Sequence, residues 1–104
     1  MKKESDARRA LLPRASDYTK DFKKDWARYN KEGKADMRRV IELMELIIFG
    51  KPLGAEWSDH ALSGKEWKGA QEAHIGGDFL LVYNCDDDFV EFVRLGTHSE
   101  LFGR

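Results

Sequence analysis

The chain has 104 residues, a length that fits one domain. Hydrophobic residues make up 41% and charged residues 36%, which is typical of a globular protein with a charged surface and excludes a disordered chain. The longest apolar runs, 46–49 and 79–83, are too short to cross a membrane, and a single cysteine, Cys85, excludes an internal disulfide and fits a reducing cytoplasm.

The first residues divide into an extension and a strand. Residues 1–10 are polar and charged, and we expect them to form an N-terminal extension of a single domain at 11–104. Residues 11–15 predict a short strand. Pro13 lacks a backbone donor, so this strand should lie at an edge of the sheet.

Two helices are predicted next. Aromatic residues at spacings of four, four and three predict a helix over about 17–30, with Ser16 or Asp17 as its N-cap. We assign to the core the aromatic residues Tyr18, Phe22, Trp26 and Tyr29.

An apolar stripe predicts the second helix over about 34–49, and Gly50 stands where a C-terminal cap belongs. The short connection at 30–33 indicates an antiparallel helical hairpin. The residues of this stripe are Met37, Val40, Ile41, Met44, Ile47 and Ile48.

The second half of the chain predicts three strands, over about 67–75, 79–85 and 89–95, with a turn at 86–88. Residues 97–103 are expected to form a short tail. A strand, two helices and a three-strand meander indicate an α+β fold, in which a small antiparallel sheet packs against an N-terminal two-helix hairpin. The other face of the sheet would stay open and could hold a site.

All three histidines, His60, His74 and His98, lie in this second half. Histidine is the side chain whose ordinary pKa suits proton transfer near pH 7, so we expect the three to act together. Strand alternation places Glu72 and His74 on the same face. If the last two strands are neighbours, one end of the sheet would gather His74, Asp78, Arg94 and His98.

Two alternatives remain open for the histidines. Each one alone could be structural: His60 in a turn, His74 in an ion pair, and His98 at the end of a strand. Three histidines could also bind zinc, although gaps of 14 and 24 residues lack the local spacing of most zinc sites. The sequence has neither a Gly-x-Ser-x-Gly nucleophile motif nor a Gly-rich phosphate loop, and we predict no metal or cofactor.

Several spaced motifs resemble one family. They are Asp59-His60-Ala61-Leu62-Ser63-Gly64, Trp67-Lys68-Gly69, Glu72-Ala73-His74-Ile75, Asp78, Leu80-Leu81-Val82-Tyr83 and Arg94-Leu95-Gly96-Thr97-His98-Ser99-Glu100-Leu101-Phe102-Gly103. Together they resemble the YafQ branch of the RelE-like toxins, which are the toxin halves of bacterial type II toxin–antitoxin pairs. The resemblance covers residues 11–103.

The resemblance implies an mRNA interferase, an endoribonuclease that cleaves messenger RNA, often on the ribosome, and so inhibits translation. It also implies a cytoplasmic protein that does not associate with a membrane. Its partner would be an antitoxin, and it would contact operator DNA only through that antitoxin. By motif position, the active-site residues would be His60, His74, Asp78, His98 and Phe102. The residues that would bind the substrate are Glu72, Lys68 and Arg94.

The implied chemistry needs no protein nucleophile, because the 2′-hydroxyl of RNA attacks the adjacent phosphate. His74 and His98 would act as base and acid, in either order, with His60 as a third donor or an orienting residue. Asp78 would fix an imidazole tautomer, and Arg94 would offset charge in the transition state. The ring of the tail phenylalanine would either position a base or plug the hydrophobic core.

Charge separates this chain from such toxins, which are usually basic. The sequence pI is near 6.3, with four excess positive charges in residues 1–48 and five excess negative charges in 49–104. This departure favours one alternative, a catalytically silent binding module with the same fold. The other alternative is a zinc-dependent hydrolase.

We expect the antitoxin to bind through an acidic or amphipathic segment, either at the basic helices or across the histidine face. The basic positions outside the apolar stripes are Lys20, Lys23, Lys24, Lys31, Arg38 and Arg39. Opposite charges there would mainly speed the encounter.

Overall fold

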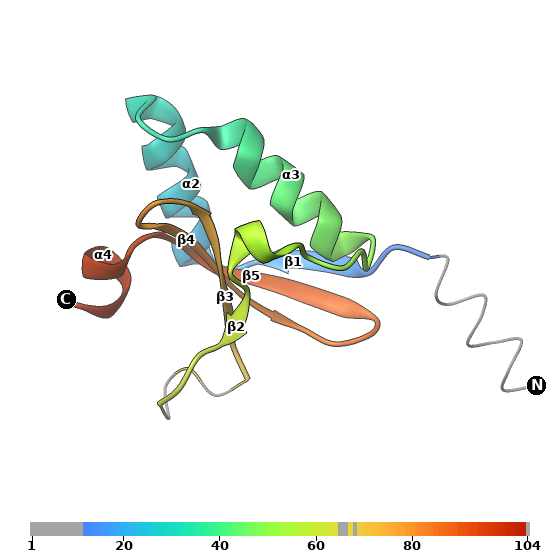
Figure 1. Ribbon diagram of the computed structural model, residues 1–104. Coiled ribbons are helices and arrows are strands. Elements are labelled where there is room, and N and C mark those ends of the chain that lie inside the picture. Colours follow the sequence, from blue (N-terminus) through green and yellow to red (C-terminus); the bar gives the residue numbers. More distant parts are fainter. Residues whose placement is uncertain (1–11, 65–66, 68, 104) are drawn as a thin grey trace, which may run out of the picture.

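The structure is a computed structural model that describes residues 12–64, 67 and 69–103. The predicted extension at 1–10 and the predicted substrate ligand Lys68 lie outside these residues. The elements in chain order (Figure 1) are β1 (Ala15–Tyr18), α2 (Lys20–Glu32), α3 (Met37–Ile48), the 3₁₀ turn η1 (Ala55–Trp57), β2 (His60–Ala61), β3 (Gln71–Gly76), β4 (Phe79–Cys85), β5 (Phe89–Thr97) and α4 (His98–Phe102). In this part of the chain, no helix has the length and apolar character that crossing a membrane requires.

The five strands form one mixed sheet in the order β1-β5-β4-β3-β2. The pairs β2–β3, β3–β4 and β4–β5 are antiparallel, whereas β1 pairs with β5 in parallel. The predicted α+β fold is therefore confirmed, and so is the edge position of the first strand. The expectation of a purely antiparallel sheet holds only from β2 to β5.

The first strand and helix both begin later than predicted. Hydrogen bonding explains the shift, because the Arg14 N–H donates to the carbonyl of Ile48 at 2.7 Å and so reaches the end of α3. Strand pairing with β5 starts only at Ala15. The helix then starts at Lys20, since Thr19 and not Ser16 or Asp17 is the N-cap, and its hydroxyl accepts the N–H of Phe22 at 2.9 Å.

The second helix is also shorter than predicted at its start. The Asp36 carboxylate caps it by accepting the N–H of Arg38 at 3.1 Å, so the helix begins at Met37. At the other end Gly50 adopts a left-handed φ of 68°, as its predicted capping place requires. The predicted stripe is wrong at Ile41, which is 43% exposed, while Leu43 is fully buried.

The main core lies between the two helices and one face of the sheet. Figure 1 shows α2 and α3 close together at their short connection and further apart towards their other ends. Both helices pack on the same face of β3, β4 and β5. The buried residues of this core include Phe22, Val40, Leu43, Met44, Ile47, Ala73, Ile75, Leu81, Tyr83, Val90, Phe92 and Leu95.

The opposite face of the sheet, predicted to be open, is partly covered. Leu80 and Val82 of β4 point to this side and are fully buried beneath Leu101 of α4. The predicted tail is thus a short helix that closes a second, smaller core. A turn in which the Ala70 N–H donates to the carbonyl of Trp67 at 2.9 Å delays β3, which begins at Gln71 and not at 67.

Candidate active site

The three histidines come together from three separate elements. His60 of β2 stands opposite Glu72 in the pairing with β3, and His74 lies two residues further along β3 on the same face. His98 is the first residue of α4. The ring centroids of His60 and His74 are 5.9 Å apart, and those of His74 and His98 are 5.8 Å apart.

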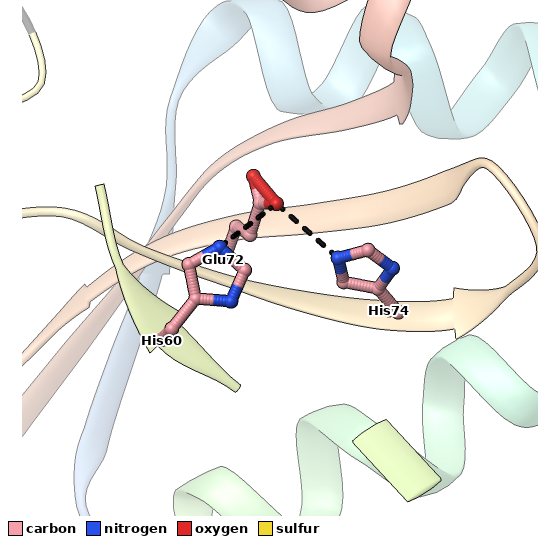
Figure 2. A group of neighbouring side chains, drawn as sticks. All are labelled: His60, Glu72 and His74. Atoms are coloured by element: carbon pink, nitrogen blue, oxygen red, sulfur yellow. Dashed lines mark hydrogen bonds and ion pairs between the residues drawn. The ribbon is translucent and has the colours of Figure 1, made fainter. Parts of the chain in front are cut away.

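A single carboxylate lies at the centre of this cluster. Glu72 is only 3% exposed, and its Oε1 lies 3.2 Å from Nε2 of His60, 3.2 Å from Nε2 of His74 and 3.6 Å from Nε2 of His98. Figure 2 shows the imidazoles of His60 and His74 on either side of the Glu72 carboxylate. The two-residue strand β2 gives no sequence pattern of its own, so this central place of Glu72 was not predicted.

Both ring nitrogens of His60 face hydrogen-bond acceptors. Its Nδ1 lies 2.9 Å from the carbonyl oxygen of Ser58, which can only accept. Its Nε2 lies 3.2 Å from the Glu72 carboxylate, another acceptor. The His60 ring is therefore held in one orientation between the Ser58 carbonyl and Glu72.

The segment before His60 is anchored to the core. The buried hydroxyl of Tyr83 donates to the Asp59 carboxylate at 2.6 Å. Burial, followed by this hydrogen bond to a negative group, raises the pKa of Tyr83 well above its usual range, so the phenol stays protonated and keeps donating. Sequence analysis did not predict this tie between Asp59 and Tyr83.

Asp78 contacts His98 through both the imidazole ring and the backbone. Its carboxylate contacts Nδ1 of His98 and also accepts the backbone N–H of His98 at 3.2 Å. The hydrogen bond from His98 lowers the pKa of Asp78, so this carboxyl is ionised near neutral pH. The prediction that these two residues share one end of the sheet is therefore correct in geometry, and Nε2 of His98 remains directed into the cluster.

Phe102 lies at the margin of the same site. A pocket of about 280 Å³ is lined by His60, Glu72, His98 and Phe102 together with residues 61–63. The Phe102 ring lies 5.9 Å from the His98 ring and meets the Trp67 ring edge-on at 5.2 Å. It therefore packs against the smaller core and faces the pocket at the same time.

Arg94 is not brought to the histidines. Its guanidinium donates to both carboxylate oxygens of Asp25 on α2, with Nε to Oδ2 at 2.8 Å. Asp25 is 6% exposed and also accepts the N–H of Leu95 at 2.9 Å. The Arg94 side chain therefore fastens β5 to α2, whereas sequence analysis had expected it beside His98.

The donor atoms of His60, Glu72 and His74 could also hold a metal ion. One ligand atom from each of them lies within 4.8 Å of the others. Two imidazole nitrogens and a carboxylate oxygen form a donor set that suits zinc or copper. The sequence spacing concealed this geometry, because the antiparallel pairing of β2 and β3 closes the 14-residue gap between the histidines.

Comparison with known proteins places this chain in a family. The mRNA interferase toxin YafQ of Escherichia coli K12 is 38% identical over 94 residues, which cover 89% of this chain and all of that protein. The structure resembles the E. coli DinJ–YafQ toxin–antitoxin complex with a TM-score of 0.80 and 39% identity, over 88% of this chain and 100% of the matched one. It also resembles a metal-bound toxin from Helicobacter pylori with a TM-score of 0.74 and 31% identity, over 85% and 98% of the two chains.

The family model described as bacterial toxin of type II toxin–antitoxin system, YafQ, matches residues 14–103. This match spans nearly every described residue and includes all three histidines. The resemblance found in the spaced motifs is confirmed. The chain belongs to the YafQ family of bacterial type II toxins.

Proposed function

We propose that this chain is an mRNA interferase, an endoribonuclease that cleaves messenger RNA and inhibits translation in the cytoplasm. The observation that carries the proposal is the cluster of three imidazoles around the buried Glu72, beside a pocket of about 280 Å³. The name of the E. coli relative, an mRNA interferase toxin, supports it. We place the cleavage on the translating ribosome.

The proposed reaction is transesterification without a metal ion. A neutral imidazole takes the proton of the RNA 2′-hydroxyl, whose oxygen attacks the adjacent phosphorus. The bond from phosphorus to the 5′-oxygen breaks, and a protonated imidazole gives its proton to that oxygen. Products are a 2′,3′-cyclic phosphate and a 5′-hydroxyl, and such proton transfers contribute about 10²- to 10⁴-fold to the rate.

We assign the proton transfers to His74 and His98. Asp78 binds Nδ1 of His98, which leaves Nε2 for the substrate. The 3.6 Å from this Nε2 to Glu72 is longer than a hydrogen bond, so His98 can turn to a phosphate oxygen at little cost. His60 is a third hydrogen-bond donor, which would stabilise the extra negative charge on the phosphorane.

The remaining predicted residues divide into those that could meet the substrate and those that have other partners. Phe102 offers a ring beside the pocket on which a base could stack. Glu72 contacts the histidines directly, so its proposed role is to orient them. To bind a phosphate, Arg94 would first have to release its contact with Asp25. Lys68 remains a proposed phosphate ligand.

Product analysis in a chelator tests the function. Purified protein is incubated with RNA, free or on programmed ribosomes, in excess EDTA. We expect cleavage with 2′,3′-cyclic phosphate or 3′-phosphate ends, and none where the scissile nucleotide lacks its 2′-hydroxyl. Intact RNA under every condition would favour the silent binding module.

A zinc-dependent hydrolase is the second candidate, because His60, Glu72 and His74 offer three converging ligand atoms. The related H. pylori toxin is metal-bound. The same assay separates the two candidates. An acid–base nuclease works in EDTA and is slowed by added Zn²⁺, which would occupy the imidazole nitrogens. A hydrolase would stop in EDTA and recover with Zn²⁺.

As a toxin of a type II system, the chain has a cognate antitoxin as its partner, and we propose where that partner binds. A groove of about 290 Å³ between α2 and α3 is lined by Tyr18, Phe22, Lys23, Trp26 and Met44. Lys20 and Lys24 are exposed on the same helix as Lys23. An apolar groove beside three lysines suits an amphipathic segment with acidic residues.

Reversing Lys20, Lys23 and Lys24 to glutamate should slow antitoxin association by about tenfold or more at low salt, because electrostatic steering would be lost. Stopped-flow measurements at several salt concentrations would show the rate and its weaker salt dependence. A triple reversal of Lys31, Lys34 and Lys51 changes the net charge equally, and none of these lysines lines the groove. Equal rates for the two variants would mean that total charge, and not this groove, governs association.

A further inference from the structure

The helix that carries His98 and Phe102 needs support from outside. α4 has only five residues, whereas isolated helices shorter than about 12 residues are marginal in water. A capping box closes its first turn: the Glu100 N–H donates to the Thr97 hydroxyl at 3.2 Å, and the Thr97 N–H donates to Oε1 of Glu100 at 3.0 Å. Leu101 is the only buried residue of this helix.

The carboxylate of Glu100 also reaches across to α2. Nη2 of Arg28 donates to Oε2 at 2.6 Å, and the Tyr29 hydroxyl donates to Oε1. Tyr29 is itself buried, and its ring packs on Phe79 with centroids 4.7 Å apart. Glu100 therefore belongs to two structures at once, the capping box of α4 and a firmly packed face of α2.

We propose that Glu100 is a positioning residue for RNA cleavage, because it ties α4 to Arg28 and Tyr29 and thereby holds the imidazole of His98 at the cluster. This inference rests on the proposed function. It concerns a residue that does not line the pocket and whose hydrogen-bond partners are Arg28, Tyr29 and Thr97 rather than the imidazoles.

The backbone beneath α4 shows how closely this helix is seated. Gly96 is the residue before Thr97 and is buried. A Cβ placed on Gly96 would lie 3.0 Å from Oε1 of Glu100 and 3.2 Å from Cδ2 of Leu101, closer than ordinary contacts. The absence of a side chain at Gly96 lets the Glu100 carboxylate reach the Thr97 backbone and Tyr29 together.

The tie remains charged at every pH at which the histidines could work. Burial alone would raise the pKa of Glu100, but the hydrogen bonds from Tyr29 and from the Thr97 backbone outweigh it and lower that pKa to about 2. Because this lies below the ordinary value of 4.5, the stabilising effect is present above pH 4.5 and is lost as the pH falls towards 2. Near pH 7 the carboxylate is fully ionised.

Replacing Glu100 with alanine should lower the single-turnover rate at saturating RNA by about 10²-fold, the effect of a misplacement of about 1 Å. Glu100→Gln keeps the oxygen that accepts from Thr97 and Tyr29, and it should recover most of the rate. Glu32→Ala is the matched control, because Glu32 pairs with the same Arg28 at 3.5 Å but lies on α2. It should retain the wild-type rate.

Nuclear Overhauser contacts between the His74 and His98 rings, 5.8 Å apart, report the position of α4 without any activity assay. They should weaken in Glu100→Ala and persist in Glu100→Gln and Glu32→Ala. If Glu100→Ala does not fold at the assay temperature, Tyr29→Phe removes one bond of the tie and should show the same loss in smaller degree. Unchanged contacts and rate, or equal losses in the Glu100 and Glu32 variants, would overturn the proposal. If the wild type cleaves no RNA while the ring contacts still weaken in Glu100→Ala and persist in the other two variants, only the proposed function is wrong.

Discussion

Replacing His98 with alanine should reduce the rate constant of RNA cleavage by about 10²- to 10⁴-fold, the range that one general acid or base contributes. The proposed role of His98 in proton transfer rests on its contacts: Asp78 binds its Nδ1, while its Nε2 lies 3.6 Å from Glu72, more than hydrogen-bond distance. Single-turnover cleavage in EDTA measures the loss. Expression of the variant in a host without antitoxin should also cause no growth arrest, in contrast to the wild type.

Ser99→Ala is the control for this substitution. Ser99 is exposed on the same short helix, one residue from His98, so its replacement tests whether any change in α4 lowers the rate. We expect it to cleave like the wild type. If His98→Ala also cleaved and arrested growth like the wild type, the assignment of the proton transfers would be wrong. If even the wild type caused no growth arrest, the silent binding module would become the better reading.

Much of the fold follows from patterns that act over a few residues. The strand at Phe79–Cys85 has its predicted bounds, because an apolar run between Gly77-Asp78 and three aspartates leaves little choice. Alternation along β3 correctly separated Glu72 and His74 from Ala73 and Ile75, which lie in the main core. The first strand does lie at an edge of the sheet, but Pro13, from which this was predicted, precedes β1, so the missing donor of Pro13 is not the reason.

Other features depend on contacts between distant segments and were missed. Nothing within residues 12–18 predicts that β1 pairs in parallel with β5, because the pairing partners lie over 70 positions away in the sequence. The place of Arg94 depends on Asp25, a buried acid on a helix whose pattern shows only an aromatic stripe. Helix α4 had a local signal that was passed over: Thr97-x-x-Glu100 is the pattern of a capping box.

The sequence predicted which residues form the cluster better than it predicted how they are arranged. The three histidines and Asp78 were correctly expected to gather, and the distances bear this out. The central position of Glu72 was not expected, because it requires the two-residue strand β2 to bring His60 across from His74. A motif can identify which residues meet, but which oxygen lies between which nitrogens is set by the pairing of strands.

Replacing Glu72 with glutamine should have the second large effect. The glutamine keeps the size of the side chain but removes a negative charge that lies 3.2 Å from two imidazole nitrogens in a site with only 3% exposure. Hydrogen bonds to a charged group contribute about 1.5–3 kcal/mol, against about 0.5–1.5 kcal/mol for neutral pairs, so the glutamine holds the His60 and His74 rings less firmly. Because a misplacement of about 1 Å costs about 10²-fold, the rate of RNA cleavage should fall by about 10²-fold.

The measurement is the single-turnover rate of RNA cleavage, with Glu91→Gln as the control. Glu91 lies on β5, where it pairs with Asp17 and Asn84 at the end of the sheet away from the histidines. Its replacement removes the same charge from the same sheet and should leave the rate unchanged. Equal losses in the two variants would mean that the total charge of the sheet, and not the carboxylate between the histidines, sets the rate. A wild-type rate in Glu72→Gln would instead mean that the imidazoles keep their arrangement without this charge, because the glutamine fills the same space.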